Sequence, residues 1–304
     1  RRDLTINTLA VREQDWEQFI ETKDVSLVID HHNGVNDLIN NIFRHVTEAF
    51  REDPVRVLRL ARFRARLGDT WSIDERTLEF IEAIHREGEL HNLTRERIWQ
   101  EVSNAVMEPH AHLFVASLVE WDILHTIFGS NGCNGPAADF TVEFEYERLK
   151  TACTQEASLP VRLAMAGFNH EDIRQIKGDT DIVKFVKGLY DVALHLSDLN
   201  DGVEVVKIFN SVNAYQNMKN YQWLLEAVGV LHGDGAHRLF DILHELSGRY
   251  GFEQLSDDVK SGDPKQFKTE IDTMRAKVIT VYCADAVEVI YNKHPDLKQE
   301  AEQA

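Results

Sequence analysis

The 304-residue chain carries 33 Lys and Arg against 51 Asp and Glu, a formal net charge of −18, and 43% of its residues are hydrophobic. This acidic balance argues against a general nucleic-acid binder, so any RNA or nucleotide site is expected to be local. The length suits two domains or one large elongated one. There is no long apolar run and no signal peptide, and the three cysteines are far apart, which predicts a cytoplasmic protein with no membrane partner and no disulfide framework.

The predicted elements begin with a strand and continue as helices. "VSLVID" alternates β-branched residues and reads as a strand that ends at Asp30, followed by the turn "DHHNGVND". Amphipathic helices are then predicted over residues 75–87, ended by Gly88, and after a capping Thr94. Further helical patterns cover residues 181–196, 202–215 and 220–232, and the Gly- and Asn-rich residues 128–140 predict a loop or domain boundary. The sequence therefore predicts a mainly α fold with a little β structure at its N-terminus.

Residues 50–68, "FREDPVRVLRLARFRARLG", concentrate five arginines on one predicted helix. Asp53 is expected to cap the helix and Pro54 to occupy its first position. At about 100° per residue, four arginines share one face roughly 120° wide, while Arg64 points elsewhere. The residues predicted to pack into the core are Val57, Leu58, Leu60, Ala61 and Ala65. The residues of the basic face are Arg56, Arg59, Arg62 and Arg66.

Two interpretations of this helix stay open. It is either a solvated basic face balanced by the acids around it, or a recognition surface. The use of Arg without Lys suits bidentate recognition of phosphates or base edges. A carboxylate at Asp53 would accept a hydrogen bond from the exocyclic amino group of cytosine or adenine, and Arg56 could donate to the ring nitrogens and carbonyl. The plain alternative for Asp53 is helix capping alone.

Four segments in order carry a family resemblance: "RRDLTINTLA" (1–10), "DHHNGVNDLINNIFRHV" (30–46), "EDPVRVLRLARF" (52–63) and "LTRERIWQEV" (93–102). Together they resemble the bacterial class II tRNA nucleotidyltransferases, the CCA-adding enzymes. Bacterial poly(A) polymerases share the first three segments, but "RHVTEAFREDPVRVLR" and "EGELHNLTRERIWQE" are more similar to the CCA-adding branch. The resemblance is clear over residues 1–105 and faint to about residue 230.

The resemblance implies an elongated helical neck, body and tail, with a small β remnant of the nucleotidyltransferase head at the N-terminus. The implied domains are a head remnant and hinge (1–40), a helical neck (41–128), a loop (129–140), and a tRNA-binding body and tail (141–304). The implied function is part of an enzyme that adds CCA to tRNA 3′ ends from CTP and ATP. The alternatives are a bacterial poly(A) polymerase and a non-catalytic RNA-binding helical module.

The resemblance also implies roles for individual residues. Asp53 and Arg56 match the family's base-selecting pair. The other implied contacts to the incoming nucleotide are Arg1, Arg2, Asp3, Asn7, Arg59 and Arg62. The implied hinge residues are Asp30, Gly34, Asp37 and Arg44. Arg97 and Glu101 match a motif that braces the selecting helix, although an ordinary surface pair four residues apart is an equally good interpretation.

In the family, the carboxylates that hold Mg²⁺ and a Gly-rich triphosphate cradle precede the "RRD" motif. We therefore expect no catalytic residue in this chain, no activity from it alone, and Mg²⁺ held by a head domain outside it. Gammaproteobacterial members often carry a His-Asp phosphohydrolase site, and the matching segment here is "RLAMAGFNHEDIRQ" (162–175). His170 lacks the usual context, so no metal site is predicted there.

Overall fold

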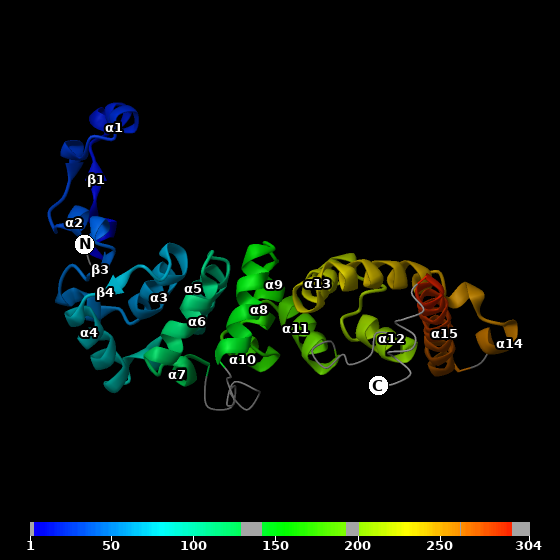
Figure 1. The fold of residues 1–304 in the computed structure, drawn as a ribbon. Coiled ribbons are helices and arrows are strands. Elements are labelled where there is room, and N and C mark those ends of the chain that lie inside the picture. The colour runs from blue at the N-terminus through cyan, green and yellow to red at the C-terminus, as the bar shows by residue number, and fades with distance from the viewer. Residues whose placement is uncertain (1–2, 129–141, 193–200, 262, 294–304) are drawn as a thin grey trace. The chain divides into compact units, whose positions relative to one another are not determined.

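The computed structural model describes residues 3–128, 142–192, 201–261 and 263–293 (Figure 1). Within these ranges helices dominate, and the strands form two small two-stranded sheets. The prediction of a mainly α fold with a little β structure near the N-terminus is confirmed.

The helices of the described residues follow one another with short connections. In the first half they are α1 Trp16–Thr22, α2 Gly34–Ile39, α3 Val55–Leu67, α4 Glu75–Arg86, α5 Arg95–Val106, α6 Ala111–Glu120 and α7 Leu124–Phe128. They continue as α8 Val142–Thr154, α9 Leu159–Met165, α10 His170–Gln175, α11 Thr180–Val192, α12 Gly202–Ser211, α13 Met218–Gly248, α14 Asp257–Lys260 and α15 Pro264–Lys293.

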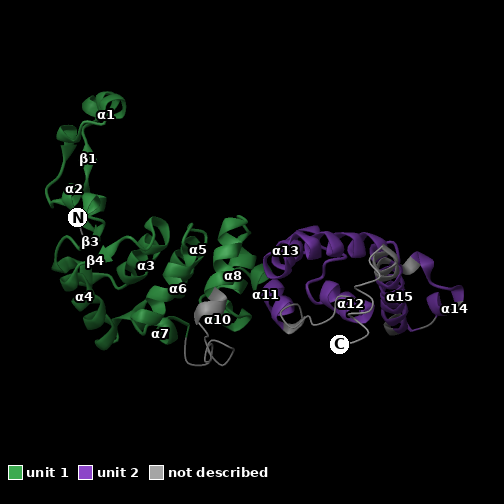
Figure 2. Ribbon diagram, in the orientation of Figure 1, with its two compact units in different colours: residues 1–183 green, residues 184–304 purple. Residues whose placement is uncertain are grey.

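The chain divides into two compact units, residues 1–183 and residues 184–304 (Figure 2). The loop predicted over residues 128–140 lies almost entirely outside the described residues. Beyond it, α8 packs on α6 and α9 packs on α5, so residues 142–183 group with the predicted neck. The finer division into head remnant, neck, loop and body stays a prediction.

The β structure is limited to two pairs of short strands. β1 (Ala10–Val11) runs antiparallel to β2 (Val28–Ile29), and β3 (Ile42–Phe43) runs parallel to β4 (Ser72–Ile73). The strand predicted over "VSLVID" is shorter than expected. Residues 25–27 form a 3-10 turn instead, because the carboxylate of Asp24 accepts the backbone N–H of Ser26 at 2.9 Å.

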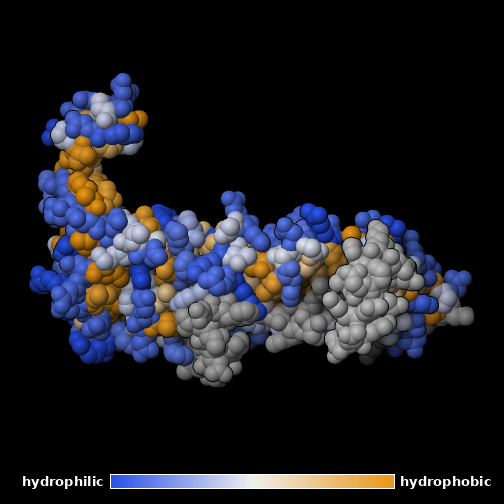
Figure 3. Space-filling view, viewed as in Figure 1, coloured by the Kyte–Doolittle hydropathy of each residue, from blue (hydrophilic) through white to orange (hydrophobic). Residues whose placement is uncertain are grey.

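Apolar side chains gather on the surface around β1 and β2 (Figure 3). On and beside α1, Trp16, Ile20 and Val25 are about half exposed. The segment of residues 10–30 therefore leaves apolar surface uncovered within unit 1.

The arginine-rich helix α3 packs its apolar face against α5 and α6. All five side chains predicted for the core are buried: Val57, Leu58, Leu60, Ala61 and Ala65. Asp53 has an extended backbone and its carboxylate accepts the Val55 N–H at 3.3 Å, so it caps the helix as predicted. Close packing on two sides fixes the direction in which the polar face of α3 points.

Other helix ends match the sequence signals in most cases. α4 is followed by Gly88 at φ 73°, a left-handed conformation that glycine adopts without strain, and Thr94 occupies the position before α5. The helix predicted over 202–215 ends earlier, at Ser211, because Asn213 adopts φ 57°. In unit 2, α12 lies so close to α15 that a Cβ on Gly202 would be 2.1 Å from the carbonyl oxygen of Ala276.

Among the described residues, none of the helices has the length and apolar character that crossing a membrane requires. Cys153 and Cys283 are free thiols, and Cys133 lies outside the described residues.

Candidate nucleotide-binding cleft

A cleft of about 470 Å³ opens in unit 1 between the start of α3, one face of α5 and the N-terminal segment. The lining side chains come from Asp3, from Asp53, Val55, Arg56 and Arg59 at the start of α3, and from Glu96, Arg97, Gln100 and Glu101 on α5. Six of these nine residues were predicted to bind nucleotide or to brace the selecting helix, so segments far apart in the sequence do meet at one place.

Asp53 stands at the centre of the cleft with both carboxylate oxygens engaged. One oxygen caps α3 and the other, Oδ2, accepts from Nη2 of Arg97 at 2.7 Å. Burial favours the neutral acid, but the hydrogen bond and charge of Arg97 outweigh it, so the pKa of Asp53 lies below its ordinary value. Asp53 is therefore ionised at neutral pH and acts only as a hydrogen-bond acceptor.

Arg56 does not contact Asp53, although the sequence pairs them. Its Nη1 donates to the backbone carbonyls of Ala49 and Phe50, at the end of the 3-10 helix Glu48–Glu52. A helical side chain leans toward the N-terminus of its helix, which carries the guanidinium of Arg56 back over these carbonyls. The guanidinium beside Asp53 belongs to Arg97 on α5.

Asp3 connects the N-terminal segment to α3. Its Oδ2 accepts from Nη2 of Arg59 at 2.6 Å and from the Asn7 amide at 3.3 Å. Arg59 and Asn7 thus lie together, as the family motif predicts, in contact with an acid of the same motif. Arg1 and Arg2 lie outside the described residues.

The remaining arginines of α3 are also matched by acids. Arg62 donates to Glu101 at 2.8 Å, Arg66 pairs with Glu108 at 2.7 Å, and Arg64 pairs with Glu120 on α6 at 2.6 Å. The interpretation of a basic face balanced by surrounding acids therefore holds for the contacts of the helix. Arg97 and Glu101 reach across to α3 and do not pair with each other, so the geometry is that of a brace between two helices.

The predicted hinge residues form a separate cluster around α2. The carboxylate of Asp30 accepts the backbone N–H groups of Gly34 and Val35, both at 2.9 Å, and so caps α2. Gly34 is required there because a Cβ would lie 2.4 Å from the carbonyl oxygen of Thr5. This contact fixes α2 against the residues that follow the "RRD" motif.

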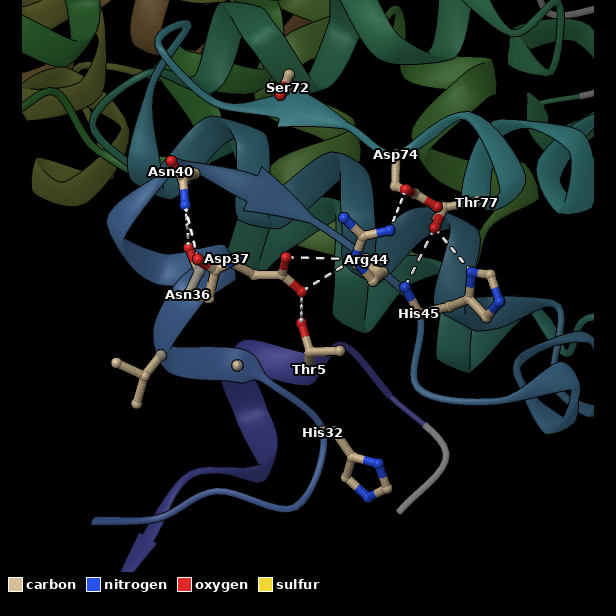
Figure 4. Close-up of polar contacts among 12 residues, drawn as sticks. Thr5, His32, Asn36, Asp37, Asn40, Arg44, His45, Ser72, Asp74 and Thr77 are labelled. Atoms are coloured by element: carbon tan, nitrogen blue, oxygen red, sulfur yellow. Dashed lines mark hydrogen bonds and ion pairs between the residues drawn. The ribbon is translucent and has the colours of Figure 1, made fainter. Parts of the chain in front are cut away.

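Asp37 is fully buried in the same cluster (Figure 4). Its carboxylate accepts from the Thr5 hydroxyl at 2.7 Å and from Nε of Arg44 at 3.2 Å. Arg44 also pairs with Asp74, which precedes α4. One guanidinium thus links α2 to α4, while the hydroxyl of Thr5 ties in the N-terminal segment.

Sequence reasoning did not select two of the cleft residues on α5, Glu96 and Gln100. Both follow the helical spacing that places them beside Arg97 and Glu101, one turn apart on the same face. That spacing was the available signal. It became informative only once α5 was known to pack on α3.

The segment around His170 contains a buried carboxylate but no assembled ligand set. His170 lies 3.2 Å from Glu171, whereas Asp172 caps α10 by accepting the Asn169 N–H at 3.0 Å. Among the described residues no group of three or more His, Cys, Asp and Glu side chains is placed to hold a metal ion.

Asp172 predicts an unusual pH dependence of stability. Burial, opposed by the Asn169 N–H, raises its pKa from 3.8 to about 7, and its Oδ1 is buried without a partner. A raised folded-state pKa favours folding below the ordinary value and loses that stabilisation as pH rises through about 7. Asp172→Asn should therefore gain stability relative to wild type as the pH is raised from 5 to 8. Thermal unfolding of both proteins across that range measures the difference, and a constant difference would contradict the assignment.

A family described as "Probable RNA and SrmB- binding site of polymerase A" matches residues 71–130, which include most of α5. The chain is 43% identical over 129 residues to the Multifunctional CCA protein of Acinetobacter baumannii (strain AYE), a match covering 42% of this chain and 29% of that relative. It is likewise 43% identical over 131 residues to the Multifunctional CCA protein of Pasteurella multocida (strain Pm70), covering 42% of this chain and 28% of that one. These matches span less than a third of the length of the curated relatives.

Solved structures extend the likeness in fold. A CCA-adding enzyme in complex with ATP matches 91% of this chain and 66% of its own, with a TM-score of 0.60 and 17% identity. The Thermotoga maritima CCA-adding enzyme complexed with tRNA matches 94% of this chain and 72% of its own, with a TM-score of 0.57 and 17% identity. The chain therefore has the fold of the helical part of the CCA-adding enzymes. Together with the sequence matches, this makes it a protein related to the CCA-adding enzymes.

Proposed function

We propose that this chain supplies the nucleotide-selecting and tRNA-binding part of an enzyme that adds CCA to tRNA 3′ ends from CTP and ATP. The observation that carries the proposal is the cleft between α3 and α5, with an ionised Asp53 at its centre. The proposal is supported by relatives named for CCA and by neighbours solved with ATP and with CTP.

The chemistry of selection follows from the acceptor-only character of Asp53. Cytosine and adenine present an exocyclic amino group that donates to a carboxylate, whereas uracil and guanine present a carbonyl oxygen that repels it. Arg97 holds the carboxylate ionised and oriented. In this proposal Arg59 and Asp3 face the sugar and phosphates, and Arg62 with Glu101 keeps α3 and α5 in register.

Other components of the reaction are assigned to the rest of the enzyme. Mg²⁺ is held by carboxylates of a catalytic head domain, where it stabilises the charge that develops during phosphoryl transfer. The helices after α5 hold the tRNA, a role consistent with the solved neighbour bound to tRNA. Such binding relies on shape and backbone contacts more than on reading bases.

A poly(A) polymerase is the second candidate, because the matching family is described as a part of polymerase A. The two activities differ in product. A CCA-adding enzyme stops after three nucleotides, whereas a poly(A) polymerase extends an RNA end with many adenylates, so product length on a gel separates them. The names of the curated relatives favour CCA addition.

Asp53→Ala tests the proposed selection. Joined to the catalytic head of a CCA-adding relative, the wild-type chain should incorporate CTP in strong preference to UTP. Losing the carboxylate removes the mismatch penalty of ~1–3 kcal/mol, so discrimination between CTP and UTP should fall by a factor of about 5 to about 100.

The matched control is Asp69→Ala, an exposed acid just beyond the far end of α3. It should select nucleotides as the wild type does. Unchanged discrimination in Asp53→Ala would leave Asp53 as a helix cap alone.

A further inference from the structure

We propose that Gln100 reads the nucleobase together with Asp53: its side-chain amide donates to the ring nitrogen next to the exocyclic amino group of cytosine or adenine. The inference rests on the proposed function, since it requires a nucleoside triphosphate to enter the α3–α5 cleft. It adds a specificity-determining residue that the sequence motifs do not single out.

The first step is that the charged side chains of α3 in the cleft already have partners. Asp53 is bonded to Arg97 at 2.7 Å, and Arg56 is held by the carbonyl of Phe50 at 3.0 Å. Arg59 is paired with Asp3 at 2.6 Å. A nucleotide that enters meets an array of satisfied charges.

The acids of α5 are satisfied in the same way. Glu101 accepts from Arg62 at 2.8 Å, and Glu96 accepts from Lys177 at 2.5 Å. Among the residues that line the cleft, all of which the structure describes, the amide of Gln100 is the polar side chain without a protein partner. Its two donors and its acceptor are therefore available to a ligand.

The second step concerns position. Gln100 follows Arg97 by one helical turn, so both side chains lie on the face of α5 that lines the cleft. Arg97 reaches the carboxylate of Asp53 from this face. The amide of Gln100 thus stands on the same wall as the group that already contacts the selecting carboxylate.

The third step is the hydrogen-bond pattern of the bases. Beside the amino group that Asp53 would accept, cytosine presents N3 and adenine presents N1, and both are acceptors. The guanidinium of Arg56, held by backbone carbonyls, is not directed at Asp53. The NH₂ group of Gln100 supplies the donor that these ring nitrogens need. A rotatable neutral amide also suits two bases of different size.

The test is an NMR titration of the 304-residue chain with CTP. The side-chain amide signals of Gln100 are assigned by their loss in Gln100→Glu, and the backbone amide of Val55, bonded to Asp53, reports on the carboxylate. Millimolar CTP should shift both signals. Gln100→Glu places an acceptor opposite cytosine N3, so it should weaken CTP binding by about fivefold to tenfold. UTP, whose N3 carries a proton, should lose less affinity.

Asn104→Asp is the matched control, because Asn104 is an exposed amide on the same helix outside the cleft. It should bind CTP as the wild type does. A CTP-induced shift of Val55 with no shift of Gln100, and wild-type affinity in Gln100→Glu, would overturn the role of Gln100 while leaving the selection by Asp53 in place. No shift at either position would overturn both the role of Gln100 and the proposed nucleotide site.

Discussion

Asp37→Ala is expected to destabilise unit 1 by about 3 kcal/mol, because it removes the acceptor of a buried, charge-assisted network. The carboxylate is fully buried and accepts from Thr5 and Arg44. Without it, the Thr5 hydroxyl is left without an acceptor and Arg44 retains only Asp74. Urea unfolding followed by circular dichroism measures the loss.

The same change should also loosen the wall of the cleft. Thr5 lies two residues from Asp3, and its backbone N–H donates to the carbonyl of Arg44 at 2.9 Å. Asn36→Ala, an exposed position on the same helix, is the control and should change stability by less than about 0.5 kcal/mol. Equal stability of the two variants would show that the buried carboxylate does not hold the hinge together.

Arg162→Met is expected to cost about 3 kcal/mol or more, although it replaces a buried charge by an apolar chain of similar length. The guanidinium is 6% exposed and donates to the carbonyl of Ala157 at 2.8 Å, with further contacts to the carbonyls of Val106 at 3.3 Å and Glu108 at 3.4 Å. Val106 is the last residue of α5, so Arg162 satisfies the end of the helix that lines the cleft. The variant leaves these carbonyls buried without a donor.

Arg174→Met is the matched control for this change. Arg174 is an exposed arginine on the following helix that pairs with Glu171 at the surface. Removing a surface ion pair costs less than about 1 kcal/mol. If Arg162→Met unfolded at the same urea concentration as Arg174→Met, the buried guanidinium would not be holding α9 to α5.

The elements of this fold were largely predictable because they carry local signals. The apolar face of α3 follows from helical periodicity, and its start follows from Asp53 and Pro54. Gly88 marks the end of α4 through its left-handed backbone. Where local signals compete, the boundaries differ: Asp24 converts the start of a predicted strand into a turn, and Asn213 ends α12 early.

The members of the cleft were predictable from motifs, but their partners were not. Asp53 and Arg56 are close in sequence, so chemistry alone pairs them, while the structure joins Asp53 to Arg97 from another helix. That contact depends on how α5 packs against α3, which no local pattern encodes. The same limit applies to Arg162, whose acceptors come from a distant helix end, and to Gln100, which becomes distinctive only when its neighbours are seen to be paired.

The most direct test of the central claim is to locate the nucleobase on the chain. The 304-residue protein is irradiated with 8-azido-ATP, digested, and the labelled peptides are identified by mass spectrometry, with CTP or UTP present as competitor. We predict labelling in peptides from residues 53–59 or 95–101, protected by CTP and much less by UTP. Labelling confined to residues 184–304, or equal protection by CTP and UTP, would contradict selection of the base in the α3–α5 cleft.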